Sequence, residues 1–133
     1  MPSYQHSRHF TIKEADGLLP WLSEKTGELT RLFEALEDKG FDIVTGKWKP
    51  RGNGHSKSPV PEEYDRFINL IAEMDKEGVV LKNYRKGVVD IPHIRPDGEE
   101  VYLCWILGEE KIGYWHRIFD TFAERAPLER PSP

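Results

Sequence analysis

Two stretches of the chain carry the hydrophobic spacing of amphipathic helices. In residues 20–39, leucines recur every seven positions at Leu22, Leu29 and Leu36, which places them along one helix face. Gly40 follows as a suitable C-terminal cap. This pattern predicts a long helix that ends at Lys39.

A shorter helix is expected upstream of this one. Thr11 and Glu14 have the spacing of a capping box, in which each side chain accepts a backbone N–H of the other residue. Pro20 then removes one backbone amide and crowds the carbonyl of Asp16. We therefore expect a short first helix followed by a kink or a restart.

The second long helix is expected to begin at Pro61, whose fixed φ suits the first helical position, and to end at Gly78. Five of its residues fall on one apolar face: Tyr64, Phe67, Ile68, Ile71 and Met74. Leu70 widens this face. The two long helices are expected to pair as an antiparallel hairpin.

After Gly78 the apolar period changes to that of strands. Residues 79–84 and 88–92 are rich in β-branched and aromatic side chains, and residues 95–98 (Arg-Pro-Asp-Gly) form a turn pattern. Residues 99–107 follow as a third strand of an antiparallel meander. Because both its odd and its even positions are apolar, we expect this strand to be central and covered on both faces.

The remaining segments complete the predicted fold. The break at 108–110 (Gly-Glu-Glu) is interpreted as the start of a last helix that runs to about Arg125. Residues 1–9 are expected to be a loose arm, 40–60 a long flexible loop and 126–133 a tail. The predicted fold class is α+β: a long antiparallel helical hairpin, a three-stranded antiparallel β-meander and a C-terminal helix packed on it.

Composition narrows the class of protein further. With 133 residues the chain has the length of a single domain, 1–133, and its net charge of −4 argues against nucleic acid and anionic membranes as partners. The longest apolar run has seven residues, far short of the ~20 that span a bilayer. The N-terminus has no apolar core of a signal peptide, and the single cysteine suits a reducing compartment. We expect a cytoplasmic protein.

His116 is the first candidate for chemistry. On the predicted last helix it lies at the border between the apolar arc and the polar side. Asp120, one turn on, can hold one ring nitrogen, and Gly113 leaves space beside the ring. An accessible, oriented imidazole can serve as a metal ligand or a general base. The alternative is a boundary histidine that is simply paired with Asp120.

Asp90 is the best strand carboxylate to join His116, since it points away from the face of Val89 and Ile91. Alternatively it pairs with Arg125 or Arg117. A metal site would then consist of His116, Asp90 and Asp120.

Two other reactive residues are given structural roles. Glu109 is interpreted as a helix N-terminal acid, because seven residues of helix separate it from His116 by ~10 Å. Cys104 lies in the centre of an apolar strand and is interpreted as inert core.

The sequence also resembles a known family. The strings GVVLKNYRKGVVDIP, EEVYLCWILGEEKIGYWH and FAERAPL, preceded by HFTIKEADGLLPWL, are similar to the uncharacterised prokaryotic family called domain of unknown function 2203. The resemblance implies no reaction. It draws attention to the residues that match the family motif: Asp90, Cys104, Trp105, Glu109, Trp115, His116 and Arg125.

Two classes of function follow. The first is a protein that binds a divalent metal ion or a small ligand around His116, with Arg125, Trp105 and Trp115 as ligand-binding residues. It includes the acid–base or hydrolytic enzymes. The second is a non-enzymatic protein that self-associates as a homodimer through the seam formed by Leu22, Leu29 and Leu36.

Overall fold

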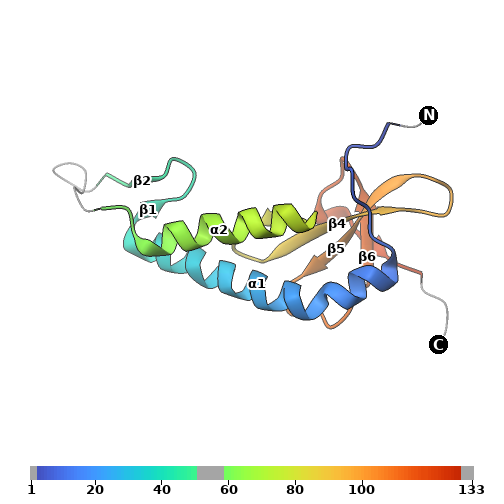
Figure 1. The fold of residues 1–133 in the computed structure, drawn as a ribbon, viewed down its shortest axis with the longest axis horizontal. Helices are drawn as coiled ribbons and strands as arrows, with labels where there is room; N and C mark the ends of the chain where they lie inside the picture. The colour runs from blue at the N-terminus through green and yellow to red at the C-terminus, as the bar shows by residue number, and fades with distance from the viewer. Residues whose placement is uncertain (1–2, 51–58, 130–133) are drawn as a thin grey trace.

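The computed structural model describes residues 3–50 and 59–129, and these residues form a mixed α+β fold (Figure 1). Two α-helices, α1 (Ile12–Lys39) and α2 (Glu62–Glu77), lie side by side and run in opposite directions. The principal sheet in the described residues is antiparallel, with five strands in the order β3-β4-β5-β6-β7. Its strands are β3 (Val80–Asn83), β4 (Val88–Ile94), β5 (Glu100–Ile106), β6 (Tyr114–Arg117) and β7 (Ala126–Pro127).

Helix α1 is longer than its sequence pattern predicts. The capping box of Thr11 and Glu14 forms as expected, but the helix continues past Pro20 without a restart and ends at Gly40, which has φ 81°. Proline costs the helix one hydrogen bond. Burial of Leu22 and Leu29 further along the helix offsets this loss, so the helix stays a single element. In α2 the predicted start shifts by one residue, because Pro61 is the N-cap and Glu62 is the first helical residue.

Charged pairs line the outer side of the two helices. Arg66 of α2 donates from Nε and Nη2 to the two carboxylate oxygens of Glu28 in α1, each at 2.8 Å. Lys25 and Glu73 form a second pair at 3.0 Å. Such half-exposed pairs contribute little to stability individually. Together they require α1 and α2 to run antiparallel, because the residue number falls from Glu28 to Lys25 in α1 while it rises from Arg66 to Glu73 in α2.

The predicted C-terminal helix is wrong. Residues 109–125 form β6, a 3-10 helix η1 (Phe122–Glu124) and the turns around them. The sequence Tyr-Trp-His-Arg of β6 alternates between two faces of a sheet, and Trp115 pairs with Leu103 of β5. Hydrogen bonding to β5 therefore overrides the helical spacing of the aromatic residues. Phe119 is 89% exposed, whereas a helix over these residues would bury it beside Trp115 on its apolar face.

The meander is correspondingly larger than predicted, with five strands in place of three within the described residues. The expectation for β5 is confirmed, since this strand is central in the sheet and its residues 101–105 are buried on both faces. Residues 40–60 are not a simple loop: β1 (Phe41–Asp42) and β2 (Lys47–Trp48) pair as a short hairpin. The part of that predicted loop at 51–58 lies outside the described residues, as do residues 1–2 of the arm and 130–133 of the tail.

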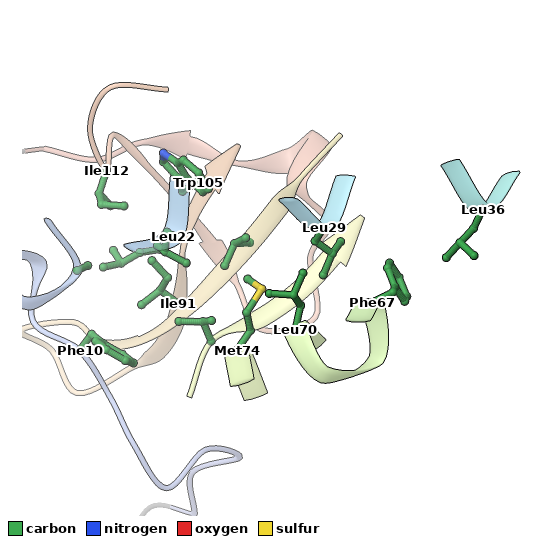
Figure 2. Packing of buried hydrophobic residues seen from close by; sticks show 14 of the residues in the cluster. Phe10, Leu22, Leu29, Leu36, Phe67, Leu70, Met74, Ile91, Trp105 and Ile112 are labelled. Atoms are coloured by element: carbon green, nitrogen blue, oxygen red, sulfur yellow. The ribbon is translucent and has the colours of Figure 1, made fainter. Parts of the chain in front are cut away.

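The hydrophobic core lies between the helices and one face of the sheet (Figure 2). Ile91 and Trp105 project from the sheet toward Leu22 and Leu29 of α1 and toward Met74 of α2. Leu22, Leu29 and Leu36 are fully buried within this single chain. The leucine seam is therefore not available for the self-association predicted for it, and the homodimer itself stays a prediction.

Within the described residues, no helix combines the length and the apolar character needed to cross a membrane.

We expect Leu29→Ala to lower the free energy of unfolding by about 2–5 kcal/mol, because it opens a cavity in the core. Ile68→Ala is the matched control, since Ile68 lies on α2 but is 44% exposed; its loss should be about 1 kcal/mol or less. Denaturant titration at two protein concentrations measures both effects. If the denaturant midpoint of unfolding rises with protein concentration, Leu29 stabilises an interface between copies of the chain. That result would contradict its burial within a single chain.

Candidate functional site

A polar cluster lies on the face of the sheet that is turned away from the helices. Alternation along the strands sends Val89 and Trp105 into the helix-side core and the side chains of Asp90 and Cys104 to the opposite face. Asp90 of β4 pairs directly with Cys104 of β5. His116 of β6 lies opposite Tyr102 and diagonal to Cys104. Three neighbouring strands thus each contribute one residue, Asp90, Cys104 and His116.

The donor atoms of these three residues converge. The carboxylate oxygen of Asp90, Sγ of Cys104 and a ring nitrogen of His116 all lie within 4.8 Å of one another. His116 Nε2 is 2.9 Å from Asp90 Oδ1. The cluster is closed to solvent: the side chains of His116 and Asp90 are 1% and 2% exposed, and Cys104 is fully buried.

The second ring nitrogen of His116 determines how the imidazole is oriented. Nδ1 lies 2.7 Å from the backbone carbonyl of Arg117. A carbonyl oxygen can only accept, so Nδ1 carries a proton and donates it. The hydrogen bond between Nε2 and Asp90 Oδ1 then contains one proton, which belongs either to the ring nitrogen or to the carboxyl group. This is the arrangement by which proteins orient a histidine toward a metal or a carboxylate.

Burial governs the protonation of the cluster. Removal from water raises the pKa of the Asp90 carboxyl above its ordinary value, and the neighbouring His116 only partly counteracts this. Burial, together with the nearby Asp90, raises the pKa of the Cys104 thiol to about 12. Cys104 is thus protonated at neutral pH in the structure as it stands, which disfavours the role of a free nucleophile.

Arg125 covers one side of the cluster. Its guanidinium lies beside Cys104 and lowers the thiol pKa, although by less than burial raises it. It is held by Glu109 through two hydrogen bonds of 2.9 and 2.7 Å, and it lies 3.9 Å from the ring centroid of Tyr114. A bidentate pair of this kind fixes the guanidinium in one orientation.

The N-terminal arm covers the other side. Tyr102 stacks edge-on against His116, and its hydroxyl is 2.6 Å from His6 Nε2. Glu100 holds the arm in place: its carboxylate accepts the backbone N–H groups of Gln5 and His6 and lies 2.7 Å from His9 Nε2. The described part of the predicted loose arm is therefore tied to the sheet.

The structure brings together two of the three predicted metal ligands. Asp90 and His116 are hydrogen-bonded, so Asp90 pairs with neither Arg117 nor Arg125. Asp120 lies in the turn after β6, outside the group of converging donors. The prediction that Asp120 and Gly113 flank an accessible imidazole depended on a helix, and it is wrong because β6 buries His116.

The predicted ligand-binding residues are dispersed. Arg125 lies at the cluster but is engaged by Glu109. Trp105 is fully buried on the helix side, where its Nε1 donates to the carbonyl of Glu109 at 2.9 Å. Trp115 lies on the same helix side, beneath Arg95. Glu109 is not a helix N-terminal acid: it pairs with Arg125 and accepts the N–H of Ile106.

Sequence reasoning missed Cys104 as a member of the cluster, although a signal for it was present. A turn centred at residue 97 pairs residue 94 with residue 100, and the same register pairs Asp90 with Cys104. The burial of Cys104 was predicted correctly, whereas its position opposite a carboxylate was not used.

The fold and the cluster together define a small α+β protein with a buried Asp–Cys–His group inside its sheet. By sequence, the chain belongs to the family described as an uncharacterized conserved protein, DUF2203, which matches residues 8–128. The resemblance noted in the sequence is thereby confirmed. No curated protein and no solved structure matches the chain.

Burial and the raised pKa of Cys104 have a direct chemical consequence. At about pH 8 only a minute fraction of this thiol is ionised, so the native protein should react with a disulfide reagent such as DTNB far more slowly than free cysteine does. In guanidinium chloride the same thiol should react at the ordinary rate. Rapid reaction of the native protein would show that the cluster is open to solvent.

Proposed function

We propose that the protein binds one divalent transition-metal ion of the zinc class through Asp90, Cys104 and His116. The observation that carries the proposal is the convergence of three different donor types within 4.8 Å in a buried site. Thiolate, imidazole and carboxylate are the ligands that zinc takes in proteins. Two donors on a tetrahedral ion, each about 2.1 Å from it, lie roughly 3.5 Å apart, so small side-chain shifts would admit the ion.

The orientation of His116 supports this function. Its Nδ1 donates to the carbonyl of Arg117, as the outer nitrogen of a metal-bound histidine commonly does. Nε2 is the nitrogen left to coordinate, and it is the one that faces Asp90. The ring needs no rotation to present a ligand to the ion.

Charge balance favours a divalent ion over a monovalent or trivalent one. A carboxylate from Asp90 and a thiolate from Cys104 supply two negative charges, and the imidazole of His116 is neutral as a ligand. A charge of +2 then leaves the buried site neutral, which reduces the cost of holding charges away from water. Arg125 is already balanced by Glu109.

Burial indicates what the ion would do. The ligands come from β4, β5 and β6 and are shielded from solvent, so a substrate has no direct route to the ion. A bound ion joins the three strands across the face that the helices leave uncovered. We therefore propose a structural or storage role for the metal site in place of a catalytic one.

Cobalt(II) provides a direct test. Loaded with one equivalent of Co²⁺, the wild type should show a thiolate-to-cobalt charge-transfer band and the intense visible bands of a site with a low coordination number. Zn²⁺ should displace it and raise the thermal midpoint, with about 2.7 kcal/mol of stabilisation at a free concentration 100 times the dissociation constant. Metal analysis of the purified protein gives the stoichiometry.

Cys104→Ala is the most informative variant, because it removes a ligand while leaving the Asp90–His116 hydrogen bond in place. It should abolish the charge-transfer band and weaken zinc binding more than about 100-fold, beyond the loss expected for an outer partner. Asp120→Asn is the control, and it should bind as the wild type does. Absence of metal from the protein, with no stabilisation by Zn²⁺ or Co²⁺, would refute the proposal and leave the cluster as a hydrogen-bonded core.

A further inference from the structure

A second site lies on the opposite, helix-side face of the sheet and is independent of the proposed metal site. A groove with a volume of about 590 Å³ opens where the start of α1, the turn after β4 and the strands β6 and β7 meet. Its apolar lining includes Ile12, Val101, Trp115 and Leu128. The volume and the apolar walls are those of a small-molecule pocket.

Arg95 provides the polar anchor of this groove. Its guanidinium lies 4.0 Å from the ring centroid of Trp115, and among the described residues it forms no ion pair. Stacking on the indole restricts the arginine to few conformations while its N–H groups remain at the edge of the plane. An arginine held in this way is suited to receive a carboxylate in a bidentate manner.

Two further polar residues line the groove. His93 Nδ1 donates to the carbonyl of Phe10 at 2.7 Å, so the ring is fixed and Nε2 has no protein partner in the described part of the chain. Glu129 lies on the same rim. Its negative charge opposes a second anionic group, which favours ligands that carry a single negative charge over dicarboxylates and phosphates.

We propose that this groove binds a small monocarboxylic acid with an apolar ring system. The carboxylate meets the edge of the Arg95 guanidinium, and the ring lies against the side chains of Ile12, Val101 and Leu128. Contact between the ring of the ligand and the apolar side chains supplies affinity, and the guanidinium of Arg95 selects a ligand with a negative charge.

Calorimetric titration with benzoate, 2-naphthoate and indole-3-acetate tests the site. At least one of the three acids should bind the wild type saturably with a 1:1 stoichiometry, and its neutral amide should bind about tenfold more weakly or worse. Arg95→Gln should reduce the affinity for the acid to that for the amide. Arg31→Gln is the matched control, because Arg31 is exposed on α1, ~28 Å along the helix from Ile12.

The outcomes separate clearly. Saturable binding that Arg95→Gln weakens and Arg31→Gln does not supports the site. The proposal is overturned if none of the acids binds, if acid and amide bind the wild type equally, or if both arginine variants behave alike. The comparison of acid with amide in the wild type remains decisive even if Arg95→Gln fails to fold. Loss of zinc binding in Cys104→Ala leaves all of these results unchanged, since the two sites lie on opposite faces of the sheet.

Discussion

The register between β4 and β5 determines the arrangement of most of the molecule. The two strands pair continuously from Val88 with Ile106 to Ile94 with Glu100. Because a strand alternates its side chains between faces, this register assigns Val89 and Trp105 to the helix-side core and Asp90 and Cys104 to the other face. A slip by one residue would exchange the two sets, and the carboxyl group of Asp90 would then enter the apolar core. The packing of the helices and the assembly of the polar cluster therefore depend on the same backbone hydrogen bonds.

The polar cluster is a costly feature in the centre of a small sheet. Burial of Asp90, Cys104 and His116 removes three polar groups from water, and the hydrogen bonds of His116 to Asp90 and to the Arg117 carbonyl recover part of that loss. A well-packed apolar replacement would avoid the cost altogether. Stability alone therefore does not account for the three polar side chains at this position.

Much of the fold could be predicted from local patterns. The leucine spacing of α1, the cap at Gly40 and the turn at residues 95–98 each specify their element within a few neighbouring residues. Strands β6 and β7 could not be predicted in this way. The spacing of Ile112, Trp115 and Phe119 is compatible with a helix, and only pairing with β5, about a dozen residues away, makes Trp115 a strand residue.

The same limitation affected the candidate site. Asp90 could be selected by its position in a strand and His116 by its residue type, but their contact joins residues 26 apart in the sequence. Glu109 and Arg125 were assigned to a helix, where they would lie far apart, whereas the turn after β5 and the segment after η1 bring them into a bidentate pair. Asp120 was included only because a helix would have placed it one turn from His116.

The attachment of the N-terminal arm has a consequence for the order of assembly. Glu100 accepts the N–H groups of Gln5 and His6 across more than 90 residues of sequence, so residues 5 and 6 cannot reach their final position until β5 has been made. Helix α1 and helix α2 can pair earlier, since their contacts are closer in sequence. The arm can cover Tyr102 only after β5 has formed, and until it docks the polar face of the sheet is open on that side. The arm thus encloses a cluster whose members lie more than 80 residues further along the chain, on β4, β5 and β6.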